Sequence, residues 1–89
     1  MAYSVVLKPA AVRDLRKLPE DIRRRVAGQI DALSWDPQPP GAEALQGERN
    51  LYRIRVGDYR LIYQIENKAL VVLVVHIGHR REVYRRLGR

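Results

Sequence analysis

The sequence predicts an α+β fold in which an N-terminal strand and a two-helix hairpin pack on an antiparallel-dominated sheet. Apolar residues recur at helical spacing between residues 9 and 33, and after residue 50 they follow the period of strands. The two patterns occupy separate stretches of the chain, which is typical of α+β proteins. The predicted order is β-α-α-β-β-β-α. A length of 89 residues allows one domain, so we expect a single domain over residues 1–89.

The first third of the chain predicts one strand and two helices. Apolar residues at positions 3, 5 and 7 have the period of a strand, which Pro9 ends. Pro9 suits the first turn of a helix, and Pro19 stops that helix. Between the two prolines, Ala11, Leu15 and Leu18 follow one another at helical spacing. A second helix begins with the acidic pair Glu20 and Asp21, where the helix dipole favours them. Its apolar stripe is Ile22, Val26, Ile30 and Leu33, and the two helices are expected to form an antiparallel hairpin.

The remaining chain predicts a loop, three strands and a short helix. Residues 34–47 are rich in proline and are expected to form a loop, with Trp35 as a lid on the core rather than a binding aromatic. Leu51–Val56 and Tyr59–Glu66 alternate on either side of a two-residue hairpin turn. Residues 70–77 are almost wholly apolar, which predicts a central strand buried on both faces. The chain then becomes rich in arginine, and residues 79–87 predict a final helix.

The hairpin register predicts a cluster of arginines. With Gly57-Asp58 as the turn, Arg55 lies opposite Arg60, and Arg53 shares their face, while the other face is apolar and suits the helices. Like charges directly opposite each other destabilise a sheet, so the cluster favours a bound anion. The alternative is that the side chains extend into water, where screening makes the repulsion mild. Ile62 and apolar residues of the third strand are expected to form a floor that strengthens an arginine–phosphate contact.

The charge of the chain points to a polyanionic partner. Lysine and arginine outnumber aspartate and glutamate by 17 to 10, which gives a net charge of +7 at pH 7, and most of the excess lies after residue 44. Nucleic acid or an acidic protein would suit this charge, and the alternative is a domain with a solvated basic face. In the tail, Arg80 and Tyr84 are expected to meet on one side of a helix, with Arg81 and Arg85 in the adjacent row. Tyr84 then stacks on a base or packs the helix down.

Several classes of chemistry lack their residues in this sequence. Cysteine is absent, which excludes disulfides and thiolate metal sites. His76 and His79 have no partner at metal-ligand spacing, so we expect no metal and no cofactor. His76 is interpreted as a structural residue and His79 as a phosphate or proton partner beside Arg80. An enzyme built from these residues would act mainly through arginine electrostatics. Because no segment has the pattern of a signal peptide or a membrane span, we expect a cytoplasmic protein.

The motifs together resemble the RelE/ParE superfamily of toxins from toxin–antitoxin pairs. The similarity covers nearly the whole chain. It rests on Met1-Ala2-Tyr3, Asp14-Leu15-Arg16-Lys17-Leu18-Pro19, Leu45-Gln46-Gly47, Tyr52-Arg53-Ile54-Arg55, Gly57-Asp58-Tyr59-Arg60-Leu61-Ile62-Tyr63-Gln64, Ile77-Gly78-His79-Arg80 and Glu82-Val83-Tyr84. The derived order of elements is also similar to the fold of that family.

The RelE branch of this family implies an mRNA interferase that cuts messenger RNA in the ribosomal A site. The implied reaction is attack by a ribose 2′-OH on the adjacent phosphate. By resemblance, Arg60 stabilises the phosphorane, Arg80 acts at the leaving 5′ oxygen, and Tyr84 stacks on the nucleotide. The RNA-binding set implied beside them is Arg53, Arg55, His79, Arg81 and Arg85. Arg53 and Arg55 stand where the best-known member has lysines, and arginine is a poor general base, so the base lies elsewhere or these positions act electrostatically.

The resemblance also implies the partners of the chain. These are a cognate antitoxin whose acidic or flexible segment wraps the toxin, the ribosome and mRNA, with no metal and no membrane. Two alternatives stay open. One is a ParE-like inhibitor of DNA gyrase without nuclease activity, and the other is a non-catalytic basic module that binds nucleic acid.

Overall fold

The computed structural model describes residues 2–85 and has the predicted α+β architecture. The elements in chain order are β1 (Ser4–Leu7), α1 (Pro9–Lys17), α2 (Glu20–Leu33), β2 (Glu43–Ala44), β3 (Leu51–Val56), β4 (Tyr59–Glu66), β5 (Val71–His79) and α3 (Arg80–Val83). Both helices of the predicted hairpin are confirmed, and the predicted elements follow one another along the chain as expected. The two-residue strand β2 is an addition, within the segment expected to be only a loop.

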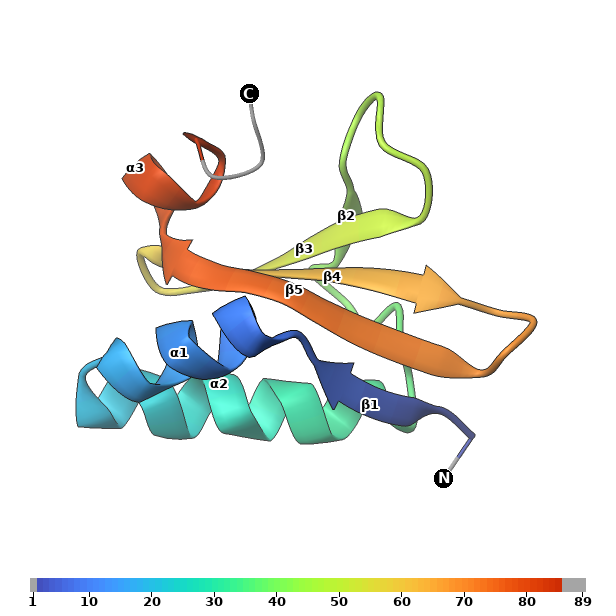
Figure 1. Ribbon diagram of the computed structural model, residues 1–89, viewed down its shortest axis with the longest axis horizontal. Coiled ribbons are helices and arrows are strands. Elements are labelled where there is room, and N and C mark those ends of the chain that lie inside the picture. Colours follow the sequence, from blue (N-terminus) through green and yellow to red (C-terminus); the bar gives the residue numbers. More distant parts are fainter. Residues whose placement is uncertain (1, 86–89) are drawn as a thin grey trace.

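The strands form one sheet in the order β1-β5-β4-β3-β2, in which only the β1–β5 pair is parallel among the described strands. The helix hairpin covers one face of this sheet, and α3 lies against the other (Figure 1). The core between the sheet and the helices contains apolar side chains from every major element. Its most deeply buried members are Ala11, Val26, Leu33, Leu61, Tyr63, Val72 and Val74.

The middle strand of the sheet is β4 rather than the strand predicted from residues 70–77. β5 is an interior strand, between β1 and β4, but its buried positions alternate with partly exposed ones. The stretch buried on both faces is Arg60–Tyr63 of β4, since α3 covers part of the second face. A register shift between Ile62 and Tyr63 leaves one extra residue in β5. Continuous apolar sequence in β5 therefore does not mark the strand with most burial.

The helix hairpin also closes one edge of the sheet. β1 pairs with β5 only as far as Val74, and α1 follows β1 immediately. Where β1 ends, the Asp14 carboxylate of α1 accepts a hydrogen bond of 3.0 Å from the backbone N–H of Ile77. A side chain thus takes the place of a neighbouring strand at this part of the β5 edge, which satisfies a backbone donor that burial would otherwise leave unpaired.

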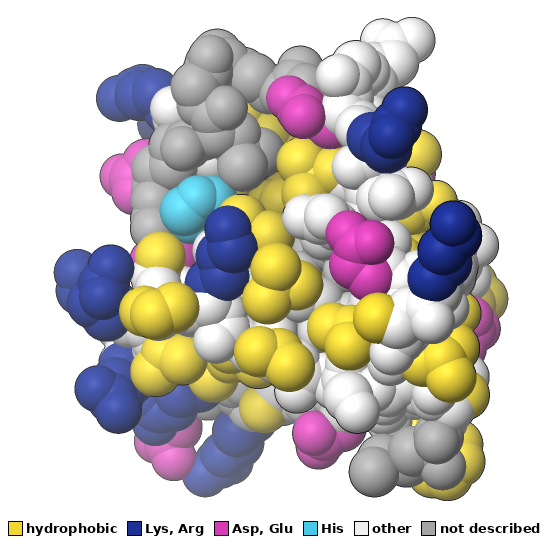
Figure 2. All heavy atoms as spheres, turned by 45° about the vertical axis from the view of Figure 1, so that its right-hand side comes forward, with side chains coloured by type: hydrophobic (Ala, Val, Ile, Leu, Met, Phe, Trp, Pro, Cys, Tyr) yellow, Lys and Arg dark blue, Asp and Glu magenta, His cyan; other side chains and the backbone are white. Residues whose placement is uncertain are grey.

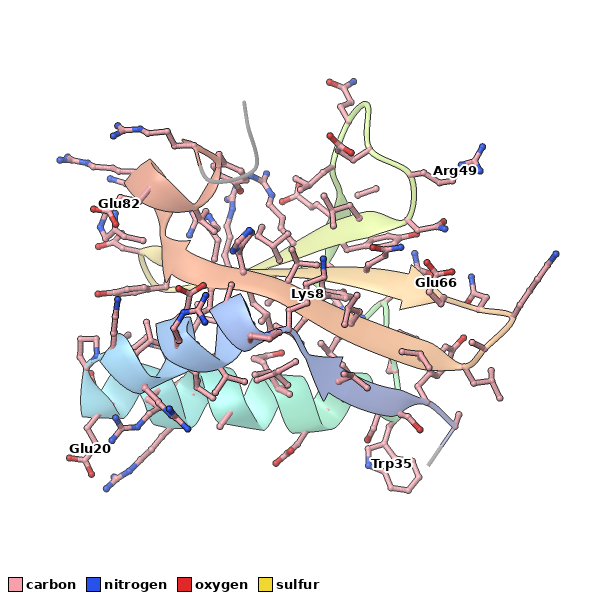
Figure 3. The ribbon with its side chains drawn as sticks, in the orientation of Figure 1. Lys8, Glu20, Trp35, Arg49, Glu66 and Glu82 are labelled. Atoms are coloured by element: carbon pink, nitrogen blue, oxygen red, sulfur yellow. The ribbon has the colours of Figure 1, made fainter. Side chains whose placement is uncertain are left out.

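The loop between α2 and β3 differs from the prediction at Trp35. The expectation of a lid on the core is wrong, because Trp35 is 69% exposed and projects beyond the end of α2 (Figure 3). The side chain that anchors this loop is Tyr63 of β4, which is fully buried and donates a hydrogen bond of 2.7 Å to the carbonyl of Pro37. Burial raises the pKa of the Tyr63 phenol. Trp35 is therefore an exposed apolar side chain. On the face of the molecule shown in Figure 2, exposed hydrophobic side chains are interspersed with those of lysine and arginine.

The predicted terminal helix is shorter than its sequence pattern. α3 spans only Arg80–Val83, and residues 86 and 87 of the predicted helix lie outside the described residues. Val83 is fully buried over β5, 3.6 Å from where a Cβ on Gly78 would stand. A Cβ on Gly78 would thus meet Val83 at an ordinary contact distance, and α3 packs on the sheet through the buried Val83 side chain. None of the helices within residues 2–85 is long and apolar enough to cross a membrane.

Candidate functional site

The candidate site lies on the sheet face opposite the helix hairpin, where the predicted hairpin register is confirmed. Arg55 pairs with Arg60, and Arg60 pairs in turn with Gly78 of β5. The next row on the same face is Glu43, Arg53, Ile62 and His76, across β2, β3, β4 and β5. We call the surface formed by Arg53, Arg55 and Arg60 the arginine face. The buried Ile62 lies on this face as predicted. Beside the arginines β5 supplies Gly78 and His76, and its apolar residues on this face, Leu73 and Val71, lie further along the strand.

Arg53 is the member of the arginine face that bonds to two other side chains. One terminal nitrogen, Nη1, donates to the Tyr84 hydroxyl at 2.7 Å, and the other, Nη2, lies 3.2 Å from the Glu43 carboxylate. The hydrogen bond to Tyr84 raises the pKa of Arg53. Burial lowers it in part, and the negative charge of Glu43 adds to the rise. Its side chain is 22% exposed. Arg53 is thus a fully ionised group held between the end of α3 and β2.

Arg55 is the exposed member. Its side chain is 59% exposed, and its Nη2 lies 3.9 Å from the same Glu43 carboxylate. An ion pair with this separation and exposure contributes little to stability. The sequence predicts that a bound anion compensates the arginine cluster, and Glu43 supplies part of that negative charge from within the protein. Arg55 nevertheless stays open to solvent.

Arg60 is the buried member, with 8% of its surface exposed. Its Nη1 donates to the carbonyls of Gly57 and Tyr59, at 3.1 and 2.9 Å. Its Nε is buried without a hydrogen-bond partner among residues 2–85. Buried donors are nearly always paired, so this unpaired Nε is unusual, and it shares that state with the Nε of Arg53.

The two-residue turn between β3 and β4 connects Arg60 to α3. The Gly57 carbonyl holds the Arg60 guanidinium, and the Asp58 carbonyl accepts a hydrogen bond of 2.8 Å from the backbone N–H of Arg80. Gly57 has a φ of +60°, the left-handed conformation that this type of hairpin turn needs. A single glycine-dependent turn therefore fixes the side chain of one predicted catalytic arginine and the backbone of the other.

The remaining tail residues are placed on different sides of α3. Tyr84 does not stack in a row with Arg80 on a long helix, because α3 ends at Val83 and the Tyr84 hydroxyl contacts Arg53. His79 caps α3 by accepting from the Arg81 backbone N–H at 3.2 Å. Its ring packs edge-on against Tyr59, on the side of the sheet that faces the helices. Arg80, Arg81 and Arg85 are exposed.

A groove of about 440 Å³ lies at the β5 edge, beside His79 rather than on the arginine face. It is lined by residues of α1, β5 and α3 that include Asp14, Lys17 and Glu82. Asp14 also lies 3.8 Å from His76 Nδ1, so His76 has a carboxylate neighbour that its sequence spacing gave no sign of. Within residues 2–85, no three histidine, cysteine or acidic side chains converge as metal ligands.

Two functional neighbours were missed from the sequence. Glu43 stands in a segment without periodicity, and its link to Arg53 depends on the short pairing of β2 with β3. Asp14 is 62 positions from His76 along the chain, so spacing gave no signal. Both are acidic residues that approach basic ones only through tertiary structure.

The family described as the ParE toxin of type II toxin–antitoxin systems, parDE, matches residues 5–84. The chain belongs to the RelE/ParE superfamily of toxins. It is 33% identical to Toxin RelG of Mycobacterium tuberculosis, over 97% of this chain and 100% of that protein. It is 31% identical to the mRNA interferase toxin RelE of Escherichia coli K12, over 94% and 92% of the two chains. The chain is thus a RelE-family toxin of the type II class.

Solved structures support the same assignment. The archaeal RelE–RelB complex of Pyrococcus horikoshii contains a chain with a TM-score of 0.78 and 31% identity, covering 93% of this chain and 100% of that one. The RelBE2 toxin–antitoxin complex of Mycobacterium tuberculosis gives a TM-score of 0.77 and 31% identity, covering 89% and 99%. The fold predicted from the sequence is therefore that of RelE structures.

Proposed function

We propose that this toxin is a metal-independent, ribosome-dependent endoribonuclease that cleaves mRNA in the ribosomal A site and so inhibits translation and growth. Relatives at about 31% identity that are named mRNA interferases support the reaction class. The observation that carries the proposal is Arg60. A buried guanidinium, fixed by two carbonyls and with its Nε unpaired, is the pre-organised donor that stabilisation of a phosphorane requires.

In the proposed reaction the ribose 2′ oxygen attacks the adjacent phosphorus, and the bond from phosphorus to the 5′ oxygen breaks. The products are a 2′,3′-cyclic phosphate and a 5′-hydroxyl end. Arg60 stabilises the phosphorane, Arg80 stabilises the negative charge on the leaving oxygen, and Tyr84 orients the nucleotide. A group of the RNA or the ribosome takes the 2′ proton, and a proton from solvent completes the 5′-hydroxyl, because arginine keeps its own protons. Arg53, Arg55, Arg81 and Arg85 hold the RNA backbone, with His79 supporting α3 as its cap. Neither Arg53 nor Arg55 removes the 2′ proton, because arginine stays protonated.

The proposed partners follow from the same surface. Solved relatives include complexes of RelE toxins with RelB antitoxins. We propose a cognate antitoxin whose acidic or flexible segment covers the arginine face, in a cytoplasmic complex. A net charge of +7 favours rapid, salt-dependent association with such a partner.

Induction of the toxin without its antitoxin, followed by mapping of message 5′ ends, tests the proposal. Arg60→Ala and Arg80→Ala should each reduce cleavage of translated messages by about 100-fold or more, as loss of an oxyanion donor does. Arg13→Ala removes the same charge from exposed α1 and should cleave normally. Intact messages with a DNA-damage response would instead establish the gyrase-directed activity that the ParE family description favours.

A further inference from the structure

Arg53 connects three elements that are far apart in the sequence. Through Nη1 it reaches Tyr84 at the end of α3, and through Nη2 it reaches Glu43 on β2, while its own backbone belongs to β3. Its Nε is buried without a partner in the described part of the chain. The guanidinium is therefore held at both ends of its fork, and the plane of the group is fixed.

The direction of the Tyr84 hydrogen bond has a consequence for its hydroxyl. Arginine has only donors, so the Tyr84 oxygen accepts from Arg53. The hydroxyl proton is then left to donate elsewhere, away from the guanidinium. A tyrosine on a freely rotating tail would lack this fixed direction. The contact thus orients the group that the proposed function assigns to the nucleotide.

Glu43 determines where Arg53 lies. Its carboxylate is 3.2 Å from Arg53 Nη2 and 3.9 Å from Arg55 Nη2, so it draws both guanidinium groups toward β2. Without that anion, Arg53 would keep its bond to Tyr84 but lose the second point that fixes its plane. Charge-assisted hydrogen bonds from both nitrogens are a property of the planar arginine fork, which a lysine ammonium does not reproduce.

We propose that Glu43 and Arg53 are positioning residues that act through Tyr84: Glu43 fixes the Arg53 fork, and Arg53 fixes the direction of the Tyr84 hydroxyl at the substrate. The effect on cleavage rests on the proposed function, whereas the coupling between the three side chains does not. It also gives arginine at position 53 a role that lysine cannot fill, since a lysine keeps the charge and loses the two-sided contact.

Cleavage kinetics test the proposal with matched variants. Glu43→Gln should lower the maximal rate of cleavage on programmed ribosomes by about 3- to 10-fold, with little change in the concentration for half-maximal rate, because a half-exposed carboxylate is removed from a positioning contact. Glu20→Gln is the control. It removes an equally charged partner from the exposed Arg24 pair on α2 and changes the net charge identically. Arg53→Lys should be slow, and adding Tyr84→Phe to it should cause little further loss.

A spectroscopic measurement tests the coupling without RNA or ribosomes. In protein with isotope-labelled arginine, restricted rotation of the Arg53 guanidinium should give separate Nη resonances that Glu43→Gln and Tyr84→Phe collapse and Glu20→Gln preserves. Absence of wild-type cleavage together with these changes would overturn the proposed function and leave the coupling intact. Unchanged Arg53 resonances in Glu43→Gln would overturn the positioning role. Faster cleavage and tighter RNA binding by that variant would also overturn it, and would show that the Glu43 carboxylate competes with RNA phosphate for the arginines.

Discussion

Replacement of Gly57 by alanine should damage activity more than it damages stability. Gly57 has a φ of +60°, and an added Cβ would lie 3.7 Å from Arg25 Nη1 and 3.9 Å from Ile22 Cδ1, both ordinary contact distances. No steric overlap therefore opposes the substitution. Its cost is the left-handed backbone conformation, about 1–2 kcal/mol for a residue with a Cβ.

The expected loss of stability is measurable in a chain of this size. A change of 1 kcal/mol shifts the melting temperature by about 4–8 °C for domains of 60–100 residues. The carbonyls of Gly57 and Asp58 also hold the Arg60 side chain and the Arg80 backbone. A turn that relaxes to relieve strain moves both arginines, and a misplacement of about 1 Å can reduce a catalysed rate by about 100-fold.

Gly47→Ala provides the control, because Gly47 has a φ of +79° in the loop before β3 and is exposed. Thermal unfolding and single-turnover cleavage would be measured for both variants at a temperature where each is folded. We expect similar losses of stability and a much larger loss of cleavage in Gly57→Ala. Equal cleavage by the two folded variants would refute the reasoning that the turn positions Arg60 and Arg80.

Three further substitutions test the fold. Tyr63→Phe should cost about 1–3 kcal/mol, because it leaves the Pro37 carbonyl without its buried donor. Because the pKa of Tyr63 is raised in the folded protein, the unfolded chain loses the phenol proton at lower pH, and the free energy of unfolding of the wild type should fall as pH rises above about 10. Denaturant titrations across this pH range should show a shallower fall in Tyr63→Phe. Asp14→Ala should destabilise by about 1–3 kcal/mol by unpairing the Ile77 N–H, and hydrogen exchange there should accelerate. Trp35→Ser should leave the unfolding free energy within about 0.5 kcal/mol, since the side chain is 69% exposed; a larger loss would restore Trp35 to the core.

The sequence was most informative where structure depends on neighbours along the chain. The register from Val56–Tyr59 to Arg53–Ile62 followed from one turn signal and from alternation, and every one of those pairs is present. Trp35 was misplaced because apolar character alone does not say which side of a loop meets the core. Glu43 was overlooked because β2 exists only through its pairing with β3, and no local pattern in two residues specifies a strand.

The charge cluster was predicted correctly in position but not in energetics. Like charges opposite each other were expected to need an external anion, and the structure compensates the three arginines in three different ways. Among residues 2–85, Arg60 is stabilised by the dipoles of two carbonyls. Arg53 bonds to a hydroxyl and a carboxylate, and Arg55 has an exposed ion pair at 3.9 Å. Such compensation depends on the loop and the tail, which lie 10 and 31 residues from Arg53 along the chain.

This unequal compensation bears on how the face can serve an anion. A guanidinium paired only with carbonyl dipoles keeps its full charge in a low-dielectric setting, where its interaction with a phosphate is strongest. An exposed arginine with a weak partner loses little when it exchanges that partner for a phosphate. Arg60 thus suits the charge that develops during reaction, and Arg55 suits the first capture of the backbone. Arg53 is less free than Arg55 to bind the RNA backbone, because both of its terminal nitrogens are already engaged, and this is the physical reason to propose that it also supports Tyr84.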